Sequence, residues 1–252
     1  MPNVLVEAKN RTTILTLNRP ERRNALTIEL LSELTEAVGR AGADENMRVL
    51  ILRGAGKAFC AGLDLNETTI TERAHQSAEL IAKTLLALSQ TRLITIAQIH
   101  GAAVAGGAGL MSACDFVVAA ERTKIGYPEA RRGLVAGLVM TFLRRQLRER
   151  DVRELLFTGD LITAERAREM GLVNRVVPPS ELENETEKLV TSILQNAPGA
   201  LASSKRLLEE LWSTSVQEDV DAALRHHMEA RGSAEAKEGI AAFLEKRAPS
   251  WV

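Results

Sequence analysis

Hydrophobic and polar positions alternate at the start of the chain, a pattern that indicates β-strands. VLVEA at residues 4–8 and TTILTL at residues 12–17 flank the turn-prone residues KNR, so a hairpin is expected. Apolar residues then recur at helical spacing from Leu30 to Val38, and Thr27 precedes this helix in a position to cap it. The chain is therefore predicted to begin with a hairpin and an amphipathic helix.

Three short apolar runs follow and have the character of buried strands. They are VLILR at residues 49–53, LITIAQI at 93–99 and DFVVAA at 115–120, and residues 72–90 between the first two return to helical spacing. Strands that alternate with helices favour right-handed crossovers and a parallel sheet. We expect an α/β core.

The second half of the chain has a different pattern. From about residue 137 the strands nearly stop, and only LVNRVV at residues 172–177 is expected to form one. Four amphipathic helices are predicted near the end, at residues 183–196, 201–211, 216–231 and 234–247. The sequence thus predicts a core over residues 1–195 and a helical C-terminal section over residues 196–252.

Composition narrows the possible partners. Of the 252 residues, 45% are hydrophobic, and 32 basic residues are balanced by 33 acidic ones. A nucleic-acid-binding protein usually shows a basic excess, and only 3% of the residues are aromatic, so no nucleic-acid partner is expected. The chain has no apolar run of the roughly 18 residues that span a membrane and no signal-peptide pattern. A cytoplasmic protein without membrane contact is predicted.

The side chains that commonly bind metals have no metal-site spacing. Cys60 and Cys114 are predicted to be reduced, buried thiols, and the four histidines are expected in packing or solvated positions, so no metal site is predicted. Seven arginines between residues 131 and 153 form a locally basic tract. Since Glu149 and Asp151 lie among them, a solvated helix face is the simpler interpretation.

Two glycine-bearing loops follow successive predicted strands. They read GAGKAFCAGLDL at residues 54–65 and IHGAAVAGGAG at residues 99–109. In a parallel sheet, ligands bind beyond the carboxyl ends of the strands, and glycine permits close backbone approach. The amides of Gly106 and Gly107 precede a predicted helix, where an anion or a developing oxyanion is favoured. Close packing of helix on strand is the alternative reason for such small residues.

The two loops together resemble the enoyl-CoA hydratase/isomerase family, also called the crotonase superfamily. FCAGLDL and HGAAVAGGAGLMSACD carry the resemblance, and LNRPERRNAL, YPEARRGLVAG, FTGDLITAERAREMGLVNRVVP and AAFLEKR extend it over essentially the whole chain in the family's order. The resemblance implies a crotonase-like ββα spiral core with a helical C-terminal section. It also implies a homotrimer or a dimer of trimers, assembled through that section.

The resemblance also implies roles for individual residues. The backbone amides of Leu63 and Gly106 would hold the carbonyl oxygen of an acyl-CoA thioester, and one such donor is typically worth ~3 to 4 kcal/mol in the transition state. The residues expected to border the coenzyme A and substrate are Arg23, Ala25, Ala61, Gly62, Asp64, Leu65, Asn66 and Gly107. Phe243 and Lys246 match positions that reach the coenzyme A of a neighbouring subunit.

The catalytic carboxylates show one departure from the family's hydratases. These enzymes usually carry two glutamates, and the matching positions here are Gly109 and Glu129. Moving a double bond requires one acid/base group, whereas hydration usually employs two. We therefore expect an isomerase that converts a 3-enoyl-CoA to a 2-enoyl-CoA, with Glu129 as the single acid/base and no cofactor beyond the coenzyme A moiety of the substrate. A single-glutamate 2-enoyl-CoA hydratase and a non-catalytic acyl-CoA binder remain alternatives.

Overall fold

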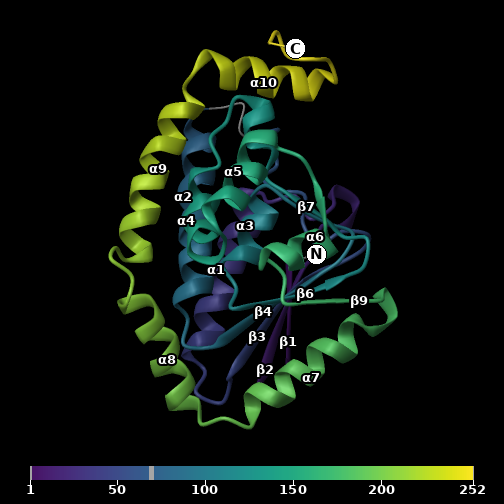
Figure 1. The fold of residues 1–252 in the computed structure, drawn as a ribbon, viewed down its shortest axis with the longest axis vertical. Helices are drawn as coiled ribbons and strands as arrows, with labels where there is room; N and C mark the ends of the chain where they lie inside the picture. The colour runs from purple at the N-terminus through teal and green to yellow at the C-terminus, as the bar shows by residue number, and fades with distance from the viewer. Residues whose placement is uncertain (1, 68–70, 252) are drawn as a thin grey trace.

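A twisted six-stranded sheet organises the fold (Figure 1). The computed structural model describes residues 2–67 and 71–251. The sheet has the strand order β1-β2-β3-β4-β6-β9, and only the β1–β2 hairpin is antiparallel. The strands are β1 (Val4–Lys9), β2 (Thr12–Leu17), β3 (Val49–Gly54), β4 (Ile94–Ile99), β6 (Phe116–Ala120) and β9 (Arg175–Val177). The predicted hairpin, parallel sheet and α/β class are confirmed.

Two long helices supply one layer against this sheet. In α1 (Ile28–Ala43), the Thr27 hydroxyl caps the first turn by accepting a hydrogen bond from the Leu30 amide at 3.2 Å, as the sequence predicted. The buried face of α1 carries Leu30, Leu31 and Leu34. α2 (Thr71–Gln90) packs along α1. The apolar spacing that predicts both helices is therefore the spacing that buries them.

A second, smaller sheet was not predicted. It consists of β5 (Ala102–Val104), β7 (Lys124–Gly126) and β8 (Ile162–Thr163). Strands of two or three residues are too short to show an alternating pattern. Of the three, only β8 lies after residue 137, where the sequence predicted a single strand at 172–177. The strand predicted at 172–177 is also shorter, and covers Arg175–Val177. The small sheet matters because it holds the backbone next to the second glycine loop.

The remaining helices build the rest of the molecule. They are α3 (Gly106–Ser112), α4 (Gly137–Gln146), α5 (Glu149–Thr158), α6 (Ala164–Met170), α7 (Leu182–Leu194), α8 (Pro198–Glu210), α9 (Val216–Arg231) and α10 (Ala234–Glu245). In Figure 1, α7 to α10 run around the outside of the core. α7 packs on β4 and β6, and α9 packs on α4 and α2. The predicted boundary at 195–196 falls between α7 and α8.

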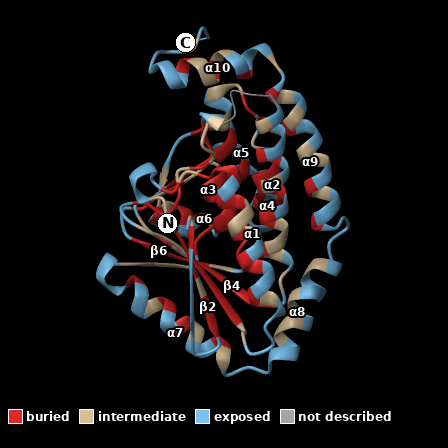
Figure 2. Cartoon of the chain, turned by 180° about the vertical axis from the view of Figure 1, so that it is seen from behind, coloured by how far each residue is buried: buried red, intermediate tan, exposed pale blue. Residues whose placement is uncertain are grey.

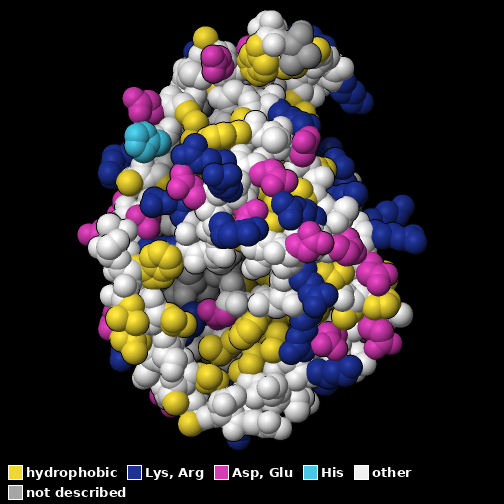
Figure 3. Space-filling model, in the orientation of Figure 1, with side chains coloured by type: hydrophobic (Ala, Val, Ile, Leu, Met, Phe, Trp, Pro, Cys, Tyr) yellow, Lys and Arg dark blue, Asp and Glu magenta, His cyan; other side chains and the backbone are white. Residues whose placement is uncertain are grey.

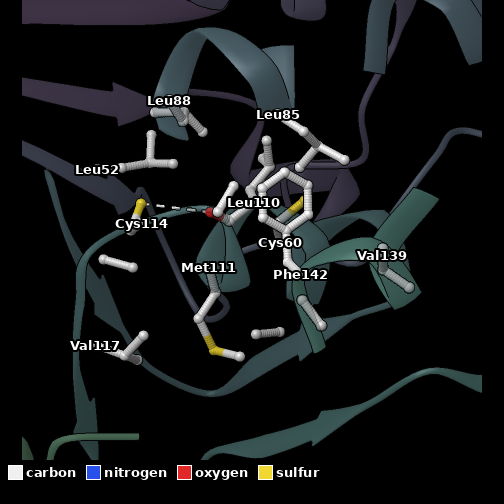
Figure 4. Close-up of a cluster of buried hydrophobic side chains, with 14 of the residues drawn as sticks. Leu52, Cys60, Leu85, Leu88, Leu110, Met111, Cys114, Val117, Val139 and Phe142 are labelled. Atoms are coloured by element: carbon white, nitrogen blue, oxygen red, sulfur yellow. Dashed lines mark hydrogen bonds between the residues drawn. The ribbon is translucent and has the colours of Figure 1, made fainter. Parts of the chain in front are cut away.

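The core lies between the large sheet and the helices of the first layer. Figure 2 shows the central strands and α3 buried, while α7 to α10 each present an exposed face. Leu85, Leu110 and Phe142, from α2, α3 and α4, meet in this core (Figure 4). Fully burying a side chain of this size contributes about 1.5–3 kcal/mol. The short helix α3 is thus held by packing on all sides.

The two cysteines are free and buried, as expected. Burial raises the pKa of both thiols to about 12, so neither is a thiolate near neutral pH. The Cys114 thiol donates to the Leu110 carbonyl at 3.4 Å (Figure 4). Both side chains therefore serve as small packing groups.

The arginine tract forms ion pairs within the fold. Arg145 joins α4 to Glu209 on α8 and, at 2.9 Å, to Asp219 on α9, while Arg148 pairs with Asp151 at 2.7 Å. On the face shown in Figure 3, Lys and Arg side chains lie among Asp and Glu. No helix in the described part of the chain is long and apolar enough to cross a membrane.

Candidate active site

A cavity of about 230 Å³ brings the predicted site residues together. It lies between the two glycine loops, the turn after β7 and the helices α4, α9 and α10. The predicted residues that line it are Arg23, Ala25, Ala61, Leu63, Asp64, Leu65, Asn66, Gly106, Glu129 and Phe243. Segments more than two hundred residues apart in the sequence therefore share one cavity.

Asn24 anchors the first loop. Its buried side-chain amide donates to the carbonyls of Ala55, Ala58 and Phe59 at 2.9, 2.8 and 3.1 Å. Because one side chain satisfies three loop carbonyls, the loop that leads to Leu63 has a defined path. Asn24 belongs to the LNRPERRNAL segment, but the sequence did not identify this role.

Leu63 is fixed by backbone pairing with Leu26. The Leu26 amide donates to the Gly62 carbonyl at 2.8 Å, and the Asp64 amide donates to the Leu26 carbonyl at 2.9 Å. The Asp64 carboxylate accepts from the Asn66 side chain at 3.0 Å and pairs with Arg19 at 3.4 Å. Asp64 therefore lines the cavity with a carboxylate that already holds the loop together.

The second loop contains a strained turn at Ala105. This residue has φ 51° and ψ −125°, a conformation that costs a non-glycine residue about 1–3 kcal/mol. The Ala105 amide donates to the Gly126 carbonyl of β7 at 2.9 Å, so the small sheet holds the turn. Gly106 follows directly as the first residue of α3.

Gly62 allows the two loops to touch. Its φ of 92° favours glycine, and a Cβ there would lie 2.9 Å from the Val104 carbonyl oxygen and 3.4 Å from the Gly106 amide nitrogen. Gly62 itself does not line the cavity. Its contribution is the close approach of one loop to the other.

Two backbone amides are brought side by side by this approach. A Cβ at Gly106 would lie 3.7 Å from the Leu63 nitrogen, so the two residues are neighbours at the cavity. Within residues 2–67 and 71–251, neither amide has a protein acceptor. Such a pair can hold an oxygen atom on which negative charge develops.

Gly107 has a packing position. A Cβ there would lie 2.5 Å from the Cys60 carbonyl oxygen and 2.7 Å from the Cys60 Cβ. The residue does not line the cavity, and its lack of a side chain permits close packing of α3 on the first loop, while its expected place beside the substrate stays a prediction. Small residues in the 99–109 loop thus have two different causes: Gly106 lies at the cavity, and Gly107 permits close packing on Cys60.

Glu129 lies in a short 3-10 turn, Pro128–Arg132, that follows β7. Within the described residues its Oε2 is buried without a hydrogen-bond partner. Burial raises the pKa of this carboxyl to about 7, against the opposing effects of its own amide and of Arg132. A carboxyl with a pKa near neutrality can both accept and return a proton.

The structure explains why residue 109 is a glycine. A Cβ at Gly109 would lie 2.5 Å from Cγ1 of Val139 and 3.7 Å from Cδ2 of Leu85. Val139 is buried on α4 and lines the cavity, so an apolar side chain occupies the direction that a residue 109 side chain would take. Glu129 thus has no carboxylate opposite it at this position.

Phe243 lies over its own chain, and its expected reach to a neighbouring subunit stays a prediction. Its ring stacks on the Arg132 guanidinium with 4.3 Å between that group and the ring centroid, and it lines the same cavity as Glu129. Lys246 ends α10 with φ 57° and does not line this cavity. The expected contact of Lys246 with another subunit stays a prediction.

Among the cavity residues that the sequence did not identify are Arg22, Val139, His227 and Arg231. The last two are buried on the inner face of α9 together with Val216 and Val220. The i, i+4 spacing of His227 and Arg231 on an apolar face is the signal that could have identified them. His227 was expected in a packing or solvated position, and the structure places it at the cavity wall.

The comparisons with known proteins agree with this geometry. Residues 7–252 match the model of the family described as enoyl-CoA hydratase/isomerase. The chain belongs to this family. It is 38% identical over 247 residues to a Thermus thermophilus relative that carries an enoyl-CoA hydratase name, and the match covers 96% of this chain and 97% of that protein.

Two further members illustrate the likeness. A short-chain-enoyl-CoA hydratase from Clostridium acetobutylicum is 33% identical, with 97% of this chain and 95% of that protein covered. A solved enoyl-CoA hydratase from Mycobacterium avium superposes with a TM-score of 0.86 at 33% identity and covers 99% of both chains. The protein is thus an enzyme of the enoyl-CoA hydratase/isomerase family with the crotonase fold, and an acyl-CoA substrate follows from the family.

Proposed function

We propose that this enoyl-CoA hydratase/isomerase family enzyme shifts the double bond of a 3-enoyl-CoA to the 2 position, with Glu129 as its single acid/base. The observation that carries the proposal is that the Val139 side chain fills the space that a side chain at position 109 would take. Because Val139 occupies it, an apolar side chain stands where a second carboxylate would be, and Asp64, the other carboxylate that lines the cavity among the described residues, is held by Arg19 and Asn66. This arrangement suits a proton transfer more than the addition of water.

The amides of Leu63 and Gly106 would stabilise the intermediate. Removing a proton from C2 of the thioester places negative charge on the carbonyl oxygen, and two fixed N–H groups stabilise that charge without reorganising. Interactions that strengthen as the charge develops accelerate the step, because they favour the transition state over the bound substrate. The strained turn at Ala105 and the glycine at position 62 keep both donors in place.

Glu129 would move one proton in two steps. Its carboxylate takes the proton from C2, which leaves a dienolate with its charge spread to C4. The protonated carboxyl then returns the proton to C4, and the double bond lies between C2 and C3. Since the proton that leaves is the proton that returns, the balance closes with no further cofactor.

A single-glutamate hydratase is the second candidate, because the Thermus thermophilus and Clostridium acetobutylicum relatives have hydratase names. In this reaction, Glu129 would position and deprotonate the attacking water, and the same amides would stabilise the enolate. A carboxylate with a pKa near 7 can serve this role as well. The two candidates share the same residues and differ in the substrate that is turned over.

The deciding experiment compares wild type and Glu129→Gln on a 3-enoyl-CoA and a 2-enoyl-CoA of equal length. We expect wild type to convert the 3-enoyl substrate, and the variant to lose at least 10²-fold in kcat, since general acid–base catalysis contributes typically 10²- to 10⁴-fold. Hydration of the 2-enoyl substrate without isomerisation would replace the proposal with the hydratase. Binding of acyl-CoA without turnover of either would leave a binding protein.

A further inference from the structure

Arg231 is a buried cation on the cavity wall. Arg231 is the last residue of α9 and is only 8% exposed. It lines the same cavity as Glu129. It also borders a second cavity beside Ala74 and His75 of α2. Arg231 therefore lies where α9 meets α2.

The guanidinium of Arg231 has unused hydrogen-bonding capacity. Its Nη1 donates to Nε2 of His227 at 3.3 Å, whereas Nε and Nη2 are buried and have no acceptor among the described residues. Across residues 2–67 and 71–251, no carboxylate lies within 4.0 Å of it. Arg145, by contrast, pairs with the carboxylates of Glu209 and Asp219.

His227 holds this guanidinium in one orientation. Its Nδ1 lies 3.0 Å from the Val135 carbonyl oxygen, which can only accept, so Nδ1 carries the proton and Nε2 accepts from Arg231. Burial and the neighbouring Arg231 lower the pKa of His227, which keeps the ring neutral. Arg231 is therefore a fixed cation whose Nε and Nη2 have no acceptor among the described residues.

An unpaired buried charge is unfavourable, and it becomes favourable when an anion completes the pair. Arginine stays protonated, and adjacent N–H groups of its planar fork match the two oxygens of a carboxylate. Nε and Nη2 form one such edge. The cavity thus presents a site for an anion, and a carboxylate has the matching geometry.

The position of Arg231 distinguishes the possible anions. Arg22 and Arg23 lie beside the 61–66 segment, where the coenzyme A is expected. Arg231 comes from a different wall, beside Ala74 and His75 of α2, and its partner His227 contacts the Val135 carbonyl that follows the Glu129 turn. Since Leu63, Gly106 and Arg231 line the same cavity, an acyl chain whose thioester oxygen rested on the first two residues would lead away from the coenzyme A into the space that Arg231 borders.

We propose that Arg231 binds a carboxylate at the far end of the acyl chain, so that the substrate is an enoyl-CoA with a terminal carboxyl group. This inference rests on the proposed function for the placement of the thioester. The terminal carboxylate accepts hydrogen bonds from Nε and Nη2, and His227 positions the guanidinium. Arg231 therefore determines specificity and takes no part in the proton transfer.

The test measures binding by calorimetry with glutaryl-CoA and pentanoyl-CoA, two saturated five-carbon acyl-CoAs that differ in the terminal group. We expect wild type to bind glutaryl-CoA at least tenfold more tightly. Arg231→Met should remove this preference by weakening glutaryl-CoA selectively. Arg225→Met is the matched control, because Arg225 is exposed on the same helix and should leave the preference unchanged.

Other outcomes would overturn the inference. Equal weakening of both ligands by Arg231→Met would mean that the guanidinium binds a phosphate of coenzyme A. Absence of a preference in wild type would mean that the acyl end is not recognised through a carboxylate. If Arg231→Met does not fold, Arg231→Lys keeps the charge without the fork and should still lower the preference.

Turnover distinguishes this inference from the proposed reaction. Wild type is assayed on the five-carbon 3-enoyl-CoA and 2-enoyl-CoA, each with and without the terminal carboxyl group. A glutaryl-CoA preference that depends on Arg231, combined with hydration, would retain this inference and reject the isomerase. Isomerisation of the methyl-terminated substrate alone would retain the isomerase and reject this inference.

Discussion

The proposed chemistry depends on a single carboxyl group, that of Glu129. It was predicted from the YPEARRG segment only through the family resemblance, since a lone glutamate after proline is ordinarily a helix-start charge. The structure adds the burial of Oε2 and the consequent rise in pKa to about 7. It also adds Val139, which fills the position opposite.

The pKa of Glu129 predicts the pH dependence of activity. In the proposed reaction the carboxylate form takes the proton from C2, so kcat/KM should fall about tenfold per pH unit below pH about 7 and level off above it. Initial rates between pH 5 and 9 on the 3-enoyl-CoA check this. A profile that is flat between pH 5 and 7 would show that Glu129 is not the base.

The same shift predicts a pH-dependent stability. The folded-state pKa of Glu129 lies above the ordinary value of 4.5. The contribution of its protonated carboxyl to the free energy of unfolding is therefore complete below pH 4.5 and is lost as the pH rises through about 7. Glu129→Gln carries no such charge and should be more stable than wild type at pH 8, by a few kcal/mol. Urea unfolding at pH 5 and 8 measures the difference, which should shrink at the lower pH.

At the scale of elements, the active site depends on how α3 packs between its neighbours. The small residues of the 99–109 loop were predicted to let the backbone reach a ligand. In the structure the Gly106 backbone lies at the cavity, whereas Gly107 packs against Cys60, and Gly62 in the first loop permits contact between the two loops. Only the packing partners separate these roles, and those partners come from distant segments.

The packing of α3 on α4 can be tested at Gly109. Gly109→Ala should lower the free energy of unfolding by about 1–3 kcal/mol, because its Cβ would lie 2.5 Å from Val139. Gly39→Ala is the control, since nothing lies within 4 Å of a Cβ on that exposed helix position, and this change should be neutral or stabilising by up to about 1 kcal/mol.

The double variant Gly109→Ala with Val139→Ala separates crowding from other causes. Removing Cγ1 of Val139 should recover part of the loss caused by Gly109→Ala, measured as a coupling energy in denaturant unfolding. If the double variant loses as much free energy of unfolding as the two single variants together, Val139 is not the group that excludes a side chain at position 109.

At the scale of the whole molecule, the C-terminal helices have two faces. α9 packs its inner face against α2 and α4, whereas large apolar side chains remain exposed on the outer elements. On α8 and the turn after it, these are Leu207, Leu208, Leu211 and Trp212. Apolar patches of this kind mark interaction surfaces.

Assembly through this surface is the remaining expectation for the section 196–252. Analytical ultracentrifugation should give the mass of three or six chains of 27.5 kDa each. Leu208→Glu with Leu211→Glu should shift the protein toward the monomer, because both side chains are exposed in the single chain. A monomer in the unmodified protein would contradict the expectation.

Hydrophobic periodicity determined most of the fold. Alternating residues predicted the hairpin, and helical spacing of apolar residues predicted α1, α2 and the last four helices. The buried strands β3, β4 and β6 were predicted from short continuous apolar runs. The short strands β5, β7 and β8 leave no such pattern, since two or three residues cannot show a period. The sequence motifs by themselves identified the family and ten of the residues that line the cavity.

Tertiary structure decided the chemistry within that cavity. The neighbouring amides of Leu63 and Gly106, the burial of Glu129 and the filled space at Gly109 depend on contacts between distant segments. Only the tertiary structure shows that α9 places Arg231 on the wall of the same cavity, where it has no anionic partner among the described residues. Local sequence records which side chains are present, whereas distance and desolvation, which set their pKa values and partners, arise from packing.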